Sequence, residues 1–224
     1  MALPAAALQV PPPSHCAPEP SIHKTEKQKM LDGEPFMPYN IQLVNERTQC
    51  MAAVYSFNKI SNTVVKMVRS EREQCLKRIV EAGWIQPACT KRPVGGHLGV
   101  SVHVATPFHC DYGYNISISD NVIIGPNCQL LDSGRISIGK NTTIGVGATI
   151  TTLEIPTDTR ILKGSKGAKV AKEVYIGENV YVGNGCIIEA GVRIGNGAII
   201  RPGSVVVRDI PPNCIAFGNP ANCT

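Results

Sequence analysis

The fold is decided by residues 174–207, which read VYIGENVYVGNGCIIEAGVRIGNGAIIRPGSVVV. An aliphatic residue returns at every sixth position of this stretch, and a glycine often follows it directly. Two earlier blocks show the same spacing, and a long gap separates them from this stretch. The positions in phase are Ile118, Ile124, Leu130, Ile138, Ile144, Ile150, Ile176, Val182, Ile188, Ile194, Ile200 and Val206.

A short fixed period of this kind is typical of a solenoid. Each hexapeptide would form one short strand and one turn, and three of them would form a triangular coil. The aliphatic residues would then stack inside the coils as a continuous column. The twelve positions in phase correspond to four coils. We expect the glycine after each aliphatic residue to let the chain turn at low steric cost. The sequence therefore predicts an all-β solenoid, a parallel β-helix.

The chain divides into three parts by pattern and composition. Residues 1–21 are rich in Ala and Pro and predict a disordered tail. Residues 22–88 predict an N-terminal helical domain, and residues 89–224 predict the β-helix, which is entered through a linker at 83–109. The helical domain carries two apolar stripes with helical spacing. The first stripe is Leu43, Cys50, Val54 and Phe57, and the second is Val64, Val68, Cys75 and Ile79.

The gap between Ile150 and Ile176 predicts a loop inserted at residues 152–172. The loop contains several lysines and two glycines and has no six-residue phase. A long excursion from a regular solenoid is more often functional than structural, because it buries little and is costly to order.

Composition excludes several classes of partner. The net charge is +5 without a dense run of Lys and Arg, so we expect no nucleic-acid partner. No stretch of 18 apolar residues occurs, so we expect no membrane span. The nine cysteines include no C-x-x-C pair, which predicts no metal site and reduced thiols in a cytoplasmic protein.

Several short motifs resemble one known family. They are EKQKMLDGE at residues 26–34, HCDYGYNI at 109–116, DIPP at 209–212 and GNPA at 218–221, together with NC at 127–128 and LD at 131–132. In this order they resemble the maltose and galactoside O-acetyltransferases, a branch of the hexapeptide-repeat acyltransferases, over roughly residues 22–224. The resemblance implies that the β-helix is left-handed and that the chain forms a homotrimer. It also implies that acetyl-CoA lies along a crevice between coils and that a small hydroxylated acceptor binds at the subunit interface.

The resemblance places the family's general base, a histidine, just after the last strand before the long loop. Ile155 occupies that position here. Glu154 beside it is a candidate replacement, if burial raises the pKa of its carboxyl group. His109 precedes Cys110 and Asp111 in the motif and is the histidine that we expect to face the cleft, where it has either a chemical or a structural role. The catalytic candidates are therefore Glu154, His109 and Asp111.

The resemblance also assigns binding roles. Asp111 and Asp132 either bind the acceptor or cap turns between coils. Lys169 and the other loop lysines either meet CoA phosphates or are solvated. The acceptor-site positions are Asn127, Asp132, Gly125 and Ile155, and the acetyl-CoA positions are Asn184, Pro202, Arg208 and Lys169.

Three functions follow from these residues. The first is an acetyl-CoA-dependent O-acetyltransferase with an atypical base, acting on a small hydroxylated molecule. The second is a CoA-independent isomerase, dehydratase or cyclase that acts in the same cleft on a small hydrophobic substrate. The third is a non-catalytic trimer that binds a ligand. A fold shared by many functions does not decide among them.

Overall fold

The computed structural model describes residues 24–61, 69–81 and 95–224. Within these ranges the N-terminal part contains the helices α1 (Glu26–Leu31), α2 (Ile41–Ser61) and α3 (Arg69–Val80). Helix α1 begins at a capping box. The Thr25 hydroxyl accepts a bond from the Gln28 backbone N–H, and the Gln28 side chain accepts one from the Thr25 N–H. The predicted tail lies outside the described residues.

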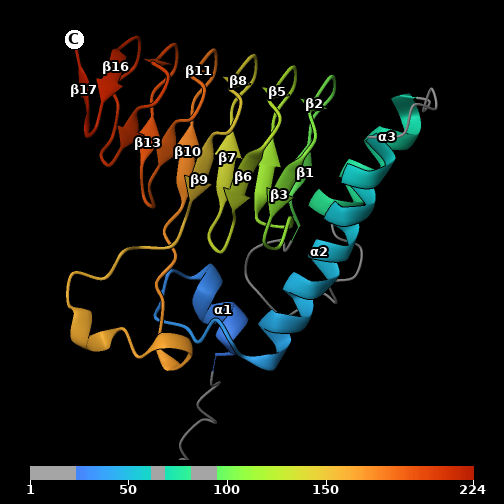
Figure 1. The fold of residues 1–224 in the computed structure, drawn as a ribbon, viewed down its shortest axis with the longest axis vertical. Helices are drawn as coiled ribbons and strands as arrows, with labels where there is room; N and C mark the ends of the chain where they lie inside the picture. The colour runs from blue at the N-terminus through green and yellow to red at the C-terminus, as the bar shows by residue number, and fades with distance from the viewer. Residues whose placement is uncertain (1–23, 62–68, 82–94) are drawn as a thin grey trace, which may run out of the picture.

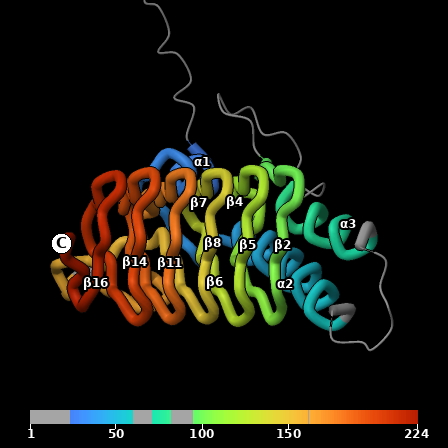
Figure 2. Tube along the Cα trace, turned by 90° about the horizontal axis from the view of Figure 1, so that it is seen from above, coloured from blue at the N-terminus to red at the C-terminus, as the bar shows by residue number. Residues whose placement is uncertain are grey.

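Helix α2 buries the first of the two predicted stripes. Leu43, Cys50, Val54 and Phe57 are all at most 4% exposed. In the second stripe Ile79 on α3 is fully buried, while Val64 and Val68 lie outside the described residues. Helices α2 and α3 cover the end of the solenoid where its first coil begins, as Figure 2 shows.

The rest of the chain is a parallel β-solenoid with three faces, as the six-residue phase predicted (Figure 1). The first sheet consists of β1 (His97–Leu98), β4 (Ile116–Ile118), β7 (Ile136–Ile138), β10 (Val174–Ile176) and β13 (Arg193–Ile194). The second consists of β2 (His103–Val104), β5 (Ile123–Ile124), β8 (Thr143–Ile144), β11 (Tyr181–Val182), β14 (Ile199–Ile200), β16 (Ile215–Gly218) and β17 (Ala221–Cys223). The third consists of β3 (Phe108–Cys110), β6 (Cys128–Leu131), β9 (Thr149–Thr151), β12 (Ile187–Ile188) and β15 (Val205–Val206).

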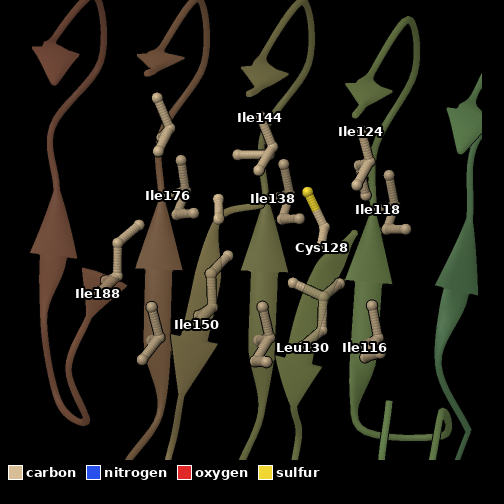
Figure 3. Close-up of a cluster of buried hydrophobic side chains, with 14 of the residues drawn as sticks. Ile116, Ile118, Ile124, Cys128, Leu130, Ile138, Ile144, Ile150, Ile176 and Ile188 are labelled. Carbon is tan, nitrogen blue, oxygen red and sulfur yellow. The ribbon is translucent and has the colours of Figure 1, made fainter. Parts of the chain in front are cut away.

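Successive coils stack in strict register, so that side chains of one kind form columns through the core. In the third sheet Leu130 pairs with Ile150, and Ile150 pairs with Ile188. All twelve aliphatic residues in the predicted phase are at most 1% exposed, and Figure 3 shows several of these columns. Burial of the columns is the main stabilising term of the fold, since each buried aliphatic side chain contributes about 1.5–3 kcal/mol.

The glycines that follow the aliphatic residues have a different role from the one predicted. A Cβ on Gly195 would lie 2.4 Å from the backbone nitrogen of Pro212, and one on Gly183 would lie 2.4 Å from that of Pro202. Both glycines are therefore needed because the next coil approaches their backbone closely. The left-handed turns occur at other positions, among them Asn141 and Asn179.

The solenoid is longer than the predicted four coils. Strands β1, β2 and β3 lie within residues 97–110, almost all of which the sequence predicts to be part of a linker at 83–109. Leu98, Val104 and Cys110 do share the six-residue spacing, but Pro and Gly nearby and the small Cys side chain weaken the pattern. At the other end β16 adds a further strand, and β17 folds back on it antiparallel.

One expectation about the cysteines is wrong. Cys214 and Cys223 form a disulfide that closes the hairpin of β16 and β17. The five free cysteines of the described residues are Cys50, Cys75, Cys110, Cys128 and Cys186, of which all but Cys75 are buried.

The predicted inserted loop leaves the solenoid between β9 and β10 and contains two 3-10 turns, Thr159–Ile161 and Gly164–Lys166. Backbone bonds close its neck, from Lys172 N–H to Thr152 O and from Glu154 N–H to Val170 O. The loop lies beside α1 (Figure 1). No helix within the described ranges is long and apolar enough to cross a membrane.

Candidate functional site

The outer face of the third sheet carries a row of aligned side chains. Because side chains alternate along a strand, the residue before each buried aliphatic residue points outward. Gln129 pairs with Thr149 and Thr149 with Ile187, so these side chains follow one another across the sheet. The whole row is His109, Gln129, Thr149, Ile187 and Val205. Of this row only His109 is among the residues predicted from the sequence, although the alternation along the strands predicts that all five side chains point outward.

His109 and Asp111 lie close together at the β3 end of this row. His109 Nε2 lies 3.7 Å from Asp111 Oδ1, which is within ion-pair range and longer than a normal hydrogen bond. The side chains are 47% and 24% exposed, so both can be reached from solvent. The Asp111 carboxylate raises the pKa of His109 above its ordinary 6.5, and partial burial of the ring opposes this effect. The structure therefore brings together two of the three catalytic candidates.

Asp132 is fully buried and caps the turn that follows β3. Its Oδ1 accepts bonds of 2.9 Å from the backbone N–H groups of Asp111 and Tyr112, and its Oδ2 accepts a longer one from Asn115. The Asn115 side chain donates back to the Asp132 carbonyl at 2.7 Å. Of the two predicted roles for Asp132, the geometry matches turn capping, since the carboxyl group does not reach the outer face.

Burial raises the pKa of Asp132 from an ordinary 3.8 to about 8, although the N–H bonds of the turn lower it. A carboxyl group with a raised folded pKa contributes stability at low pH that is lost as the pH rises through that value. We therefore expect the free energy of unfolding to fall between pH 3.8 and about 8, and Asp132→Asn to remove this part of the slope.

Urea unfolding at a series of pH values measures this slope. His109 adds a loss in the same direction only near and above its ordinary 6.5. The lowered pKa values of Glu26 and Asp158 act in the opposite direction at acid pH, so the difference between the wild type and Asp132→Asn is the quantity that reports Asp132. Asp120→Asn is a matched control, because the exposed Asp120 also accepts a backbone bond, from Val100 N–H at 2.8 Å. A slope that survives in Asp132→Asn would contradict the prediction.

One edge of the third sheet, where the second sheet turns into it, contains four of the predicted binding positions. Asn184 and Pro202 stack on successive coils, because Gly203 N–H donates to Asn184 O at 2.8 Å. Both are exposed, and Asn184 Oδ1 accepts a bond from Val146 N–H at 2.9 Å. Two coils earlier, Asn127 and Gly125 occupy the same edge near β3.

Gly125 is fixed by packing against the next coil. A Cβ at this position would lie 2.8 Å from the backbone nitrogen of Val146. The acceptor-binding side chain that the resemblance places here therefore has no room in this chain. Asn127 is exposed, and its backbone has a φ of 60°, a conformation that Asn adopts more easily than most residues.

The opposite edge contains the other predicted positions. Glu154 Oε1 lies 2.6 Å from Lys172 Nζ, and its side chain is 42% exposed, so this subunit does not provide the burial that a carboxylate base would need. Ile155 is 69% exposed. Lys169 pairs with Phe36 through two backbone bonds of 2.9 Å, and Arg208 bonds Asn222 Oδ1.

All the predicted site residues thus lie on the third sheet or at its two edges, except Asp132, which is buried beneath one edge, and Lys169, which is in the adjoining loop. Neighbouring strands are about 4.8 Å apart, so β3 and β9 are separated by about 10 Å and β3 and β15 by about 19 Å. An extended molecule could therefore contact Arg208 and still reach His109. The described residues contain no cluster of His, Cys, Asp or Glu that could hold a metal ion.

A shallow groove of about 270 Å³ lies elsewhere, beside Tyr175, Arg193 and Asp209 on the first sheet and its adjoining turn. It contains none of the predicted site residues.

Comparisons with known proteins identify the relatives of this chain. A family model described as bacterial transferase hexapeptide (six repeats) matches residues 173–208, and one described as maltose acetyltransferase hexapeptide capping motif matches residues 29–82. Nodulation protein L of Rhizobium meliloti is 40% identical over 126 residues, covering 56% of this chain and 68% of that protein. A galactoside O-acetyltransferase of Lactococcus lactis is 30% identical over 199 residues, covering 88% of this chain and 86% of that protein.

Two solved structures extend the likeness to the fold. A maltose O-acetyltransferase from Clostridium difficile 630 superposes with a TM-score of 0.76 at 34% identity, covering 90% of this chain and 96% of the other. A hexapeptide-repeat acetyltransferase from Vibrio cholerae, solved with acetyl-CoA, gives a TM-score of 0.73 at 27% identity, covering 89% and 97%. These likenesses confirm the predicted fold class, a left-handed parallel β-helix with an N-terminal helical region.

Proposed function

Because the chain belongs to the maltose and galactoside branch of the hexapeptide-repeat acetyltransferases, we propose that it transfers an acetyl group from acetyl-CoA to a hydroxyl of a small molecule, with His109 as the general base. The observation that carries this proposal is the pairing of His109 with Asp111 on the outer face of the third sheet. An acetyltransferase needs a base at the acceptor hydroxyl, and Ile155 has no titratable group to provide one.

Charge and geometry favour His109 over Glu154. The Glu154 carboxylate is engaged in an ion pair with Lys172 Nζ at 2.6 Å, and its side chain is 42% exposed. The His109 ring is held on one side by Asp111, which leaves its other nitrogen free to accept a proton. Asp111 also stabilises the imidazolium that forms when the proton arrives, as a carboxylate does in other catalytic pairs.

The reaction then runs as follows. The acceptor oxygen attacks the thioester carbonyl carbon while His109 takes its proton. The carbon–sulfur bond breaks, the acetyl group stays on the acceptor oxygen, and His109 returns the proton to the departing CoA sulfur. No covalent intermediate with the protein is required. His109 must be neutral to act, so the rate is expected to rise with pH through the raised pKa of His109.

The donor would lie along the third sheet. The exposed edge at Asn184 and Pro202 offers backbone to a long, narrow molecule, and Arg208 offers a positive charge for phosphate. The lysines of the inserted loop add positive charge near the same face.

Self-association is part of the proposal, as the family resemblance implies a homotrimer. The outer face of the second sheet carries an in-register row in which Thr143 separates Ile123 from the consecutive apolar residues Tyr181, Ile199 and Ile215. The four apolar side chains are each 41–48% exposed. Exposed apolar side chains that gather on one face favour an interface between protein surfaces.

Calorimetric titration with acetyl-CoA tests the proposal. We expect saturable binding at one site per chain, and Arg208→Gln to raise the Kd by about 10- to 100-fold, because a bond to a charged group contributes about 1.5–3 kcal/mol. Arg193→Gln, on the first sheet, is the matched control and should leave the Kd unchanged. A folded protein that does not bind acetyl-CoA would overturn the transferase proposal and turn attention to CoA-independent chemistry in the same cleft.

A further inference from the structure

Contacts from the N-terminal helices hold the turn that contains Asp111 in place. Tyr112 and Tyr114, the tyrosines of the HCDYGYNI motif, are 0% and 2% exposed and belong to a small second core outside the solenoid. The Tyr112 hydroxyl accepts a bond of 2.6 Å from Arg47 Nη1 on α2. Arg47 Nη2 donates to the Pro38 carbonyl at 2.7 Å, so both ends of its guanidinium are held. The guanidinium therefore links Tyr112 to the segment before α2.

The second tyrosine is held through a buried ion pair. The Tyr114 hydroxyl donates to Glu46 Oε2 at 2.6 Å, and Lys27 Nζ lies 2.9 Å from Glu46 Oε1. Lys27 also lies 4.4 Å from the centroid of the Tyr114 ring. The side chains of Lys27 and Glu46 are only 3% and 13% exposed. A buried pair of this kind is costly to disrupt, because removing one partner leaves the other charge unpaired.

The same turn is fixed from two further directions. Asp132 accepts three of its backbone N–H groups. Gly113 has a φ of 76°, and a Cβ there would lie 2.2 Å from the Ile79 carbonyl at the end of α3. Asp111 is thus part of a turn that α2, α3 and Asp132 hold in place. Its own carboxylate faces His109.

We propose that Arg47 and Glu46 are positioning residues that hold the Asp111–Asn115 turn and thereby set the geometry of the His109–Asp111 pair. This inference rests on the proposed function of that pair. Neither residue touches the outer face of the third sheet. Each acts through a tyrosine hydroxyl, and the aspartate follows the position of its neighbour Tyr112. The helical domain would then determine the strength of the base as well as cover the end of the solenoid.

Few charged groups lie around His109, so its pKa reports mainly on the position of Asp111. Asp111 is the closest titratable group, and Asp132 acts on His109 from beneath the turn. The adjacent strand β6 presents the uncharged Gln129. Helix α2 packs against β3 through the uncharged Asn58 and through the buried thiol of Cys50, which lies against Cys110. Loosening the turn should therefore reach His109 mainly through Asp111.

The test is an NMR titration of the His109 ring in the full chain, with His109→Gln used to assign its resonance. In Arg47→Met we expect the pKa of His109 to fall toward its ordinary 6.5, because Asp111 moves away. We expect kcat to fall by about 10²-fold, as for a misplacement of about 1 Å, while the KM for acetyl-CoA stays unchanged. If Arg47→Met does not fold, Tyr112→Phe and Tyr114→Phe replace it in the test. Each deletes one hydroxyl, and we expect each to lower the pKa of His109 by a smaller amount.

Arg72→Met is the matched control. Arg72 on α3 also donates to a solenoid carbonyl, that of Val104, and stacks on the Phe57 ring at 5.5 Å, but it does not touch the turn. It should lower stability and leave the pKa of His109 unchanged. An unchanged pKa in folded Arg47 and tyrosine variants overturns the positioning role. A lowered pKa with unaltered turnover keeps the positioning role and overturns His109 as the base.

Discussion

Replacing His109 with glutamine is expected to lower kcat/KM for acetyl transfer by about 10²- to 10⁴-fold, the usual contribution of a general base. Glutamine keeps a polar side chain of similar length but cannot take a proton near neutral pH. Binding of acetyl-CoA should be retained, because in the proposed mechanism His109 contacts the hydroxyl of the acceptor and not the phosphates of CoA. Release of free CoA thiol in the presence of a panel of small alcohols and sugars measures the rate.

The pH profile of the same reaction tests the partner of His109. Asp111→Asn removes the charge that raises the pKa of His109, so the acid limb of kcat/KM should move to lower pH while the maximal rate falls. His103→Gln is the matched control, because His103 is an exposed, outward-facing histidine on β2 of the second sheet. A His109→Gln enzyme with the wild-type rate would exclude His109 as the base and return Glu154 to consideration.

The second large effect concerns the fold. Ile124→Ala is expected to lower the free energy of unfolding by about 2–5 kcal/mol, because it removes buried methyl groups and leaves a cavity in a column that neighbouring coils cannot close. Ile123→Ala, one position earlier in the same strand, should change it by about 0.5 kcal/mol or less when measured on the dissociated subunit, in which this side chain is half exposed. The two side chains are 0% and 48% exposed, although they are chemically identical.

Urea unfolding of the two variants gives both free energies, with far-UV circular dichroism to show that each is folded. Equal destabilisation by the two substitutions would contradict the assignment of inward and outward faces. In the assembled protein Ile123→Ala should cost more stability than in the dissociated subunit, because the proposed trimer covers the outer face of the second sheet.

The solenoid could be predicted from the sequence because the six-residue spacing that specifies it is short and repeats along the chain. Every sixth residue is aliphatic and faces the core, so the positions from Ile118 to Val206 together form three buried columns, one on each sheet. The N-terminal helices were predictable for a similar reason, since Leu43 and Phe57 belong to a stripe with helical spacing. The first coil was missed because its inward positions include Cys110, whose small side chain gives a weak signal.

The candidate site was predictable only in part. The sequence pointed to His109 and Asp111 through a motif, but their separation of 3.7 Å depends on the turn that follows β3. It left the role of Asp132 open between acceptor binding and turn capping, and burial decides in favour of capping. The tyrosine contacts with Arg47 and Glu46 join residues 65 and 68 positions apart, and no local pattern predicts such pairs.

The sequence by itself determined the six-residue period, the inward-facing columns, the inserted loop and the residue types available for chemistry. Each of these depends on the identity and spacing of residues that are close together in the sequence. Only the tertiary structure decided which side chains meet. Coil stacking places residues about twenty positions apart side by side, as for His109 and Gln129, and helix packing brings in residues from much farther away. Burial and charge then determine which of the assembled groups, above all His109 beside Asp111, can exchange a proton with a bound molecule.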